Sequence, residues 1–286
     1  MKDRLRKAIV AALRSGLRLT GETGRRLVAE AQAQGGESLL EVVEHVDTKR
    51  GRVAFYCLGD LALWRARTLL TKEPETIEWI DSFRAGDVFW DVGANVGLYA
   101  LYAAMTNRLE VLAFEPSASN YLLLNRNVEI NRASDRVRAY CVAFAGETHI
   151  DVLNMQSTQF GGAMATFAET KDFAGEEFKP SFCQGAIGFS IDEFIAQFNP
   201  PFPNHLKIDV DGIEDKIVAG ARKTLADPRM RSVSIELEAD RVEYTRGVLE
   251  RLAAAGLKLV SKRHAEMFEG TRFADVYNYR LERISS

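Results

Sequence analysis

The segment Asp91-Val92-Gly93-Ala94-Asn95-Val96-Gly97 constrains the fold of this chain more than any other stretch. It follows the short apolar run Val88–Trp90, while Glu115 ends the next apolar run and precedes a proline. A strand, a glycine turn, a helix and a second strand that ends in an acidic residue form one mononucleotide-binding half of a Rossmann-like sheet. The sequence therefore predicts a parallel α/β fold with a ligand site at this turn.

The glycine spacing indicates which ligand this turn would bind. Dinucleotide sites favour G-x-G-x-x-G, because the middle glycine lets the backbone approach a pyrophosphate. Here Asn95 takes the middle position, and only the outer glycines, Gly93 and Gly97, remain. A tight turn without a phosphate cradle suits a nucleoside that lacks phosphates. S-adenosyl-L-methionine (SAM) is the common ligand of this kind, and we expect it as the cofactor.

We expect different residues around the turn to contact different parts of the cofactor. We expect Asp91 to orient the methionine end, directly or through water, and Asn95 to contact the methionine portion through its amide. Glu115 follows the turn at close to the ~20 residues of the general pattern, where a carboxylate accepts the ribose hydroxyls. Ala143 ends the third expected strand, over 137–143, and a fourth strand is expected over 149–153. The predicted cofactor-binding residues are Asp91, Gly93, Asn95, Gly97, Glu115 and Ala143.

A second polar stretch spans residues 207–214. Alternation along the expected strand 206–210 places Lys207, Asp209 and Asp211 on the same side. Charged groups are costly in a core unless they are paired, so this pattern implies a polar cleft. An architectural Lys207–Asp209 ion pair would also explain it. A third interpretation is an Asp-x-Asp metal pair of the glycosyltransferase type; we discount it because a nucleoside-type turn comes first, and we expect no metal.

The motifs together resemble the FkbM family of SAM-dependent methyltransferases, over about residues 50–280. The resemblance implies a class I methyltransferase fold with a seven-stranded, mostly parallel sheet and helices on both faces. It also implies methylation of hydroxyl oxygens on sugars, lipid-linked glycans and polyketides. Asp211 departs from the family, in which glutamate is more frequent. The matching motifs are Asp91–Gly97, Phe114-Glu115-Pro116, Asn127 with Asn131, and Lys207–Glu214.

Methylation of an alcohol requires loss of the hydroxyl proton near the transition state, so a base is expected. Asp209 is the leading candidate, and His205 is its rival because histidine titrates near neutrality, although a position before the strand favours exposure. Lys207 would lower a carboxylate pKa or hold acceptor oxygens. Glu236, on the neighbouring strand expected over 232–238, would orient the hydroxyl or pair with Lys207. The predicted catalytic residues are therefore Asp209, Lys207, His205 and Glu236.

Residues 154–185 show no sustained period and contain Gly161-Gly162. A loop of this length in a compact domain is usually functional or disordered, and we expect it to close over the acceptor as a lid. Two other functions remain open. The protein could be a nucleoside-binding module without turnover, or a metal-dependent glycosyl transferase that uses Asp209 and Asp211.

The chain has an uneven charge distribution that bears on its domains and partners. Residues 1–26 carry a net charge of +6, so the remaining 260 residues carry −9 of the total −3. An apolar residue recurs every four positions from Leu5 to Leu17, which predicts a basic amphipathic helix. Such a helix can pack on its own domain or a second subunit, or lie on an anionic membrane. We predict a helical extension over 1–50, with helix expected over 1–45, and a methyltransferase domain over 51–286.

Net charge, cysteine content and hydrophobicity indicate which partners and which location to expect. The net charge of −3 gives no reason to expect a nucleic-acid partner. The three cysteines are far apart, which fits a reducing compartment. No apolar stretch approaches the roughly 20 residues that span a bilayer. A cytoplasmic protein is expected, with a peripheral place at the inner membrane surface left open by the basic segment; its acceptor would be a small molecule or glycan. The oligomeric state cannot be predicted.

Overall fold

The computed structural model describes residues 16, 21–24, 26, 42–264 and 266–283. The chain divides into two compact units, residues 1–42 and 43–286, and the account below concerns the second unit. Most of the predicted N-terminal extension, including its apolar stripe, lies outside the described residues. Within the described part of the chain, no helix is long and apolar enough to cross a membrane.

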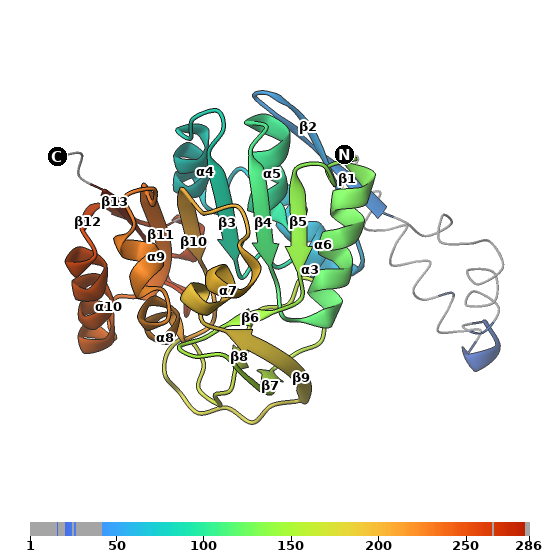
Figure 1. Ribbon diagram of the computed structural model, residues 1–286. Helices are drawn as coiled ribbons and strands as arrows, with labels where there is room; N and C mark the ends of the chain where they lie inside the picture. The colour runs from blue at the N-terminus through green and yellow to red at the C-terminus, as the bar shows by residue number, and fades with distance from the viewer. Residues whose placement is uncertain (1–15, 17–20, 25, 27–41, 265, 284–286) are drawn as a thin grey trace. The chain divides into compact units, whose positions relative to one another are not determined.

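A seven-stranded sheet organises the second unit (Figure 1). The strands from β5 to β11 pair in parallel, and β13 alone runs antiparallel to both of its neighbours. This arrangement confirms the predicted Rossmann-like α/β class, with the closing strand pair at the C-terminus. In spatial order the strands are β12 (Leu257–Arg263), β13 (Val276–Arg283), β11 (Ser232–Glu238), β10 (His205–Ile208), β3 (Val88–Val92), β4 (Glu110–Phe114) and β5 (Val137–Tyr140).

Helices cover both faces of this sheet because its strands present apolar side chains in both directions. Phe89 of β3 belongs to the core under the earlier helices, whereas Trp90, the next residue, belongs to the core under the later ones. The earlier set is α3 (Gly59–Thr68), α4 (Pro74–Asp81), α5 (Leu98–Thr106) and α6 (Ala118–Ile130). The later set is α7 (Ile191–Phe198), α8 (Glu214–Ala219), α9 (Arg222–Ala226) and α10 (Val242–Ala254).

The strand order reverses between β3 and β10. From β3 the chain builds outward through β4 to β5, and it then returns to add β10 and β11 on the other side of β3. In open parallel sheets, a crevice forms at such a switch point, outside the carboxyl ends of the strands. The glycine turn after β3 and the acidic stretch after β10 therefore meet at one place.

A second sheet of four strands corrects three expectations. The third central strand ends at Tyr140, and Ala143 starts a separate strand in this other sheet. The expected strand over 149–153 also belongs there, and part of segment 154–185 is strand rather than loop. Short strands interrupted by glycines hide the alternation that would have revealed them. In spatial order they are β6 (Ala143–Phe144), β9 (Phe182–Phe189), β7 (His149–Met155) and β8 (Ala165–Phe167). Figure 1 shows this sheet at the end of the central sheet toward which β3 and β4 point.

A two-stranded hairpin, β1 (Val42–Thr48) and β2 (Gly51–Cys57), precedes the first helix of the unit. Helix was expected through residue 45, and β1 is a strand because it pairs with β2. Two side chains of α6 hold β2 in place: Asn131 bonds both backbone groups of Ala54, and Asn127 accepts from the Tyr56 N–H. Asn127 also donates to the Val96 carbonyl at 2.8 Å. These two asparagines thus join the hairpin to the glycine turn.

Candidate active site

A cavity of about 520 Å³ opens at the switch point. Gly93 follows β3, Glu115 follows β4, Asp209 follows β10, and Glu236 lies on β11; all four line the cavity. The residues come from four adjacent parallel strands, so the sheet brings together groups that are as much as 143 positions apart in the sequence. This position is the one that the strand order predicts for a ligand.

The glycine turn lies unusually close to the end of β10. A Cβ on Gly93 would stand 1.8 Å from the carbonyl oxygen of Asp209, and the Gly93 φ of +83° is one that favours glycine. The amide groups of Gly93 and Ala94 both donate to the Phe114 carbonyl at 3.0 Å. The turn is therefore fixed against both neighbouring strands. Gly97, which precedes α5, packs against Leu124 and does not line the cavity.

Glu115 turns its carboxylate toward the glycine turn. One oxygen accepts the Asn95 N–H at 2.8 Å, and the other accepts the Ser117 N–H at 2.9 Å. Burial raises the pKa of Glu115 to about 7, even though these two hydrogen bonds favour the ionised form. The side chain is buried in the protein but borders the cavity. A ligand that donates hydroxyl groups would stabilise its ionised form.

Asp91 lies inside the protein rather than on the cavity wall. Its Oδ2 accepts the Ala100 N–H of α5 at 3.1 Å, which ties β3 to that helix. Its Oδ1 is buried and has no hydrogen-bond partner among the described residues. Burial raises the pKa of Asp91 to about 6, against the opposing effect of Lys207. One oxygen thus remains available near the turn.

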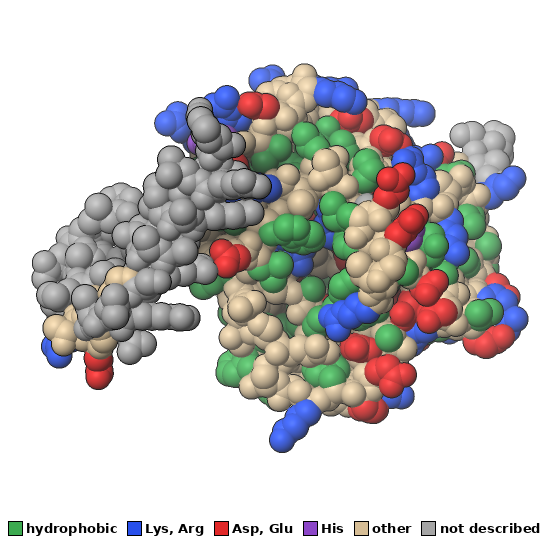
Figure 2. Space-filling view, turned by 180° about the vertical axis from the view of Figure 1, so that it is seen from behind, with side chains coloured by type: hydrophobic (Ala, Val, Ile, Leu, Met, Phe, Trp, Pro, Cys, Tyr) green, Lys and Arg blue, Asp and Glu red, His purple; other side chains and the backbone are tan. Residues whose placement is uncertain are grey.

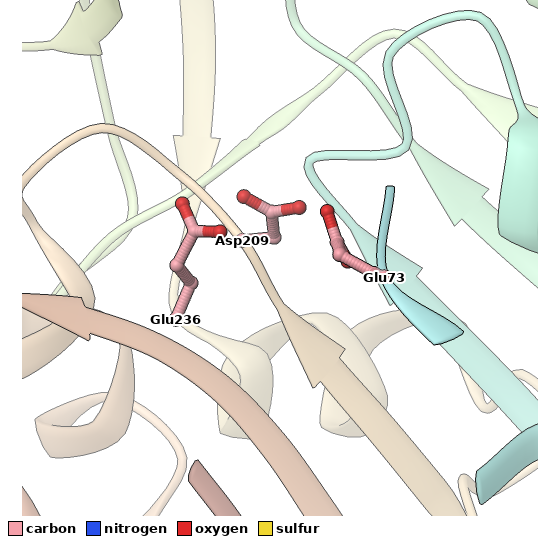
Figure 3. Close-up of side chains that lie close together, drawn as sticks. All are labelled: Glu73, Asp209 and Glu236. Atoms are coloured by element: carbon pink, nitrogen blue, oxygen red, sulfur yellow. The ribbon is translucent and has the colours of Figure 1, made fainter. Parts of the chain in front are cut away.

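Three carboxylates and two lysines form a charged cluster in the floor of the cavity. Oxygens of Glu73, Asp209 and Glu236 lie within 4.8 Å of one another, and their side chains point toward a common centre (Figure 3). Lys72 forms an ion pair with Glu73, and the buried Lys207 forms one with Asp209. Two ammonium groups therefore already balance part of the negative charge.

The cluster shifts the pKa values of two of its carboxylates in opposite directions. Burial alone would raise the pKa of Asp209, but Lys207 and Lys72 outweigh burial and hold that pKa below its usual range. Burial and the negative charge of Asp209 raise the pKa of Glu236 well above its usual range. Asp209 is thus shifted toward its ionised form and Glu236 toward its protonated form.

The glycine pair of segment 154–185 lies against the glycine turn. The Gly162 carbonyl accepts hydrogen bonds from the side-chain amides of Asn95 at 2.7 Å and Asn120 at 2.9 Å. Asn120 in turn accepts the Gly161 N–H, and Arg65 donates to the Gly161 carbonyl at 2.5 Å. Gly162 lines the cavity. The segment therefore forms one wall of the cavity beside the turn.

Residues 91–267 match the family model of the methyltransferase FkbM domain. This chain belongs to the FkbM methyltransferase family. The hexuronic acid methyltransferase AglP of Haloferax volcanii is 25% identical over 83% of this chain and 86% of its own. The 31-O-demethyl-FK506 methyltransferase FkbM of Streptomyces tacrolimicus is 26% identical over 68% of this chain and 80% of its own. A solved FkbM methyltransferase from Methylobacillus flagellatus shares 14% identity with a TM-score of 0.47, over 78% of this chain and 55% of that one.

The FkbM fold brings most of the predicted site residues together. Gly93, Asn95, Glu115, Asp209 and Glu236 line one cavity, and the buried Lys207 contacts Asp209. Asp91 and Gly97 support the turn from behind. Ala143 is a correction: it is buried under the later helices and does not line the cavity, because the chain leaves the central sheet at Tyr140.

His205 is a second correction. It begins β10, so it lies at the amino end of the strand, opposite the cavity, and it is buried rather than exposed. One ring nitrogen contacts Asp87 at 2.9 Å and the other contacts the Ser232 hydroxyl at 2.7 Å; that hydroxyl accepts from Trp79. The ring also stacks on Phe83. A neutral imidazole satisfies this chain of donors and acceptors, which gives His205 an architectural role.

Because His205 is neutral in the fold, acid should destabilise this protein. Burial lowers the pKa of His205 to about 4 in the folded protein, whereas a histidine in an unfolded chain has a pKa of about 6.5. Between about pH 6.5 and 4, His205 binds a proton in the unfolded state but not in the folded state. The free energy of unfolding therefore falls as the pH drops toward 4. Urea unfolding at pH 7.5 and 4.5 should show a contribution of about 2–3 kcal/mol from this residue. The variant His205→Gln should lack that part of the pH dependence; an unchanged dependence would contradict the assignment.

Several cavity residues escaped the sequence analysis. The predicted site residues did not include Lys72 or Glu73, nor Trp64 and Arg65 of α3. The segment between β12 and β13 also reaches the cavity, through residues such as Phe268 and Arg272. No local motif marks these residues. The sequence offered one general signal only: a buried charged group is costly unless it is paired, so the charges of the cavity need partners.

Proposed function

We propose that this protein is a SAM-dependent O-methyltransferase that methylates a hydroxyl group on a sugar, a glycan or glycolipid, or a polyketide-like molecule. The observation that carries the proposal is Glu115, a buried carboxylate that borders a cavity at the switch point of a methyltransferase fold. The names of the two curated relatives, one for a hexuronic acid and one for an FK506 derivative, support acceptors of these kinds.

The residues present fit SAM. A cavity of about 520 Å³ lies within the ~300–1,000 Å³ usual for cofactor sites. In the proposed complex, Glu115 accepts the ribose hydroxyls, and Asp91, whose Oδ1 has no partner among the described residues, serves the methionine end through water. Asn95 faces the same end from the turn. When bound, SAM supplies the methyl group from a positively charged sulfur.

Asp209 is the proposed base. Lys207 occupies its Oδ2, and Oδ1 accepts no hydrogen bond from the described residues. The two lysines keep the carboxylate ionised, so it accepts the proton as the acceptor oxygen becomes bonded to carbon. Glu236 keeps its own proton and donates a hydrogen bond that orients the acceptor oxygen. Gly161-Gly162 excludes water from the reacting groups.

Calorimetric titration with S-adenosylhomocysteine, the demethylated product, tests the cofactor without knowledge of the acceptor. We expect micromolar binding that weakens at least tenfold in Glu115→Ala, because two ribose hydroxyls lose their acceptor. Glu147→Ala is the matched control, since Glu147 is exposed and does not line the cavity. It should bind like the wild type.

The other outcomes separate the alternatives. No binding of S-adenosylhomocysteine would contradict the proposal. Consumption of a sugar nucleotide that stops on chelation would instead support a metal-dependent glycosyl transferase. Binding without methyl transfer to any sugar, glycolipid or polyketide acceptor would support a nucleoside-binding module.

A further inference from the structure

One part of the cavity wall has a chemistry of its own. Its wall consists of aromatic and basic side chains, contributed by α3 and by the segment between β12 and β13. Figure 2 shows hydrophobic and basic side chains gathered around a hollow on one face of the molecule. We call this part the outer wall; it comprises Trp64, His264, Phe268, Arg272 and Phe273.

Arg272 is the cation of the outer wall that is not committed to a carboxylate. Its guanidinium lies 4.8 Å from the ring centroid of Phe273 and 5.7 Å from that of Phe173, and these two rings stack on each other at 5.3 Å. Among the described residues, no carboxylate forms an ion pair with Arg272. Stacking holds a planar guanidinium while it leaves the N–H groups free to bind an anion.

The charges nearby favour an anion at this place. Lys72 and Lys207 are each matched by one carboxylate, Glu73 and Asp209. Arg65 donates to a backbone carbonyl rather than to an acidic side chain. The five residues of the outer wall include no carboxylate, so Arg272 gives this part of the cavity a positive charge.

The aromatic residues indicate what else the acceptor offers. Trp64 is 38% exposed, so a large apolar surface faces a site that otherwise holds charged groups. Phe268 and Phe273 lie edge to face at 6.0 Å on the segment that carries Arg272. Rigid aromatic walls with one charged anchor suit a compact ring that has both an apolar face and an ionic substituent.

We propose that the acceptor carries an anionic group, a carboxylate or a phosphate on a sugar ring, and that Arg272 binds this group while the ring packs against Trp64 and Phe268. The inference rests on the proposed function, and it makes Arg272 the residue that sets specificity. Arginine binds either oxyanion through paired N–H groups. The anionic group is then held at the outer wall, and a ring hydroxyl reaches toward Asp209.

Three sugars that differ only at C6 test the inference. Methyl β-D-glucoside is neutral, methyl β-D-glucuronide carries a carboxylate, and methyl β-D-glucoside 6-phosphate carries a phosphate. Each is titrated into the full chain loaded with S-adenosylhomocysteine. We expect at least one anionic sugar to bind about tenfold or more tightly than the neutral one. The better of the two identifies the anion. Equal affinities, or no binding of either anionic sugar, would overturn the inference.

Variants assign the effect to Arg272. Arg272→Gln should reduce the preference for the anionic sugar to within about threefold, and Arg272→Lys should keep part of it because the charge remains. Lys262→Gln is the matched control: Lys262 is another cation over an aromatic ring, 4.2 Å from Tyr277, but it does not line the cavity. It should keep the full preference, and an equal loss there would show general electrostatics and overturn the assignment.

Cofactor loading separates this inference from the function on which it rests. All of these variants should bind S-adenosylhomocysteine like the wild type, because they leave Glu115 and the glycine turn unchanged. Cofactor binding without a preference for the anionic sugar overturns the inference alone. Failure of the wild type to bind the cofactor overturns both.

Discussion

The variant Asp209→Asn should lose about 10²–10⁴-fold in methyl transfer while its affinity for S-adenosylhomocysteine stays within a few-fold of the wild type. The amide has nearly the shape of the carboxylate but cannot take up the hydroxyl proton. Glu115 and the glycine turn, which hold the proposed cofactor, are not changed. Turnover is measured as transfer of labelled methyl groups from SAM to the sugar of the series above that accepts them.

Glu236→Gln is the informative comparison, because Glu236 lies in the same carboxylate group as Asp209. If Glu236 acts through its proton as a donor, an amide can replace it, and the loss should stay below about tenfold. Asp209→Asn also leaves the buried Lys207 without its ion-pair partner, which destabilises the protein. The melting temperature and the cofactor titration therefore accompany the kinetics. Turnover within tenfold of the wild type would remove Asp209 from the role of base.

The central sheet and the cofactor half of the cavity could be predicted because their signals are local. The turn from Gly93 to Gly97 and the acidic residue Glu115 mark places where the backbone itself must be special, and the strands before them are short apolar runs. Strand β11, over Ser232–Glu238, was predicted at its observed bounds. Such features depend on neighbours in the sequence, so one sequence suffices to find them.

The remaining features depend on partners that are distant in the sequence. β1 is a strand because it pairs with β2, and α3 borders the cavity because the hairpin and α6 place it there. Lys72 and Glu73 join Asp209 only through the fold. His205 was misassigned for a different reason: four residues of strand separate the amino end from the carboxyl end, and only the carboxyl end faces the ligand.

Replacing Gly93 with alanine should disrupt the site more than the same change at Gly86, although both glycines have nearly the same backbone conformation. Their φ angles are +83° and +86°. Each alanine would cost about 1–2 kcal/mol for the left-handed conformation alone. A Cβ at Gly86 meets no atom within 4 Å, whereas one at Gly93 would lie 1.8 Å from the Asp209 carbonyl oxygen. The difference between the two variants therefore isolates the close approach.

The added cost at Gly93 falls on backbone, which cannot move aside as a flexible side chain does. The end of β10 must shift, and Asp209 shifts with it, so Gly93→Ala should lose both stability and cofactor binding. Gly86→Ala should lower the melting temperature by about 2–8 °C, from ~2–4 °C per kcal/mol, and keep cofactor affinity. We expect at least twice that decrease for Gly93→Ala, together with a tenfold or greater loss of S-adenosylhomocysteine affinity. Equal melting temperatures and affinities in the two variants would mean that β3 and β10 do not approach this closely in solution.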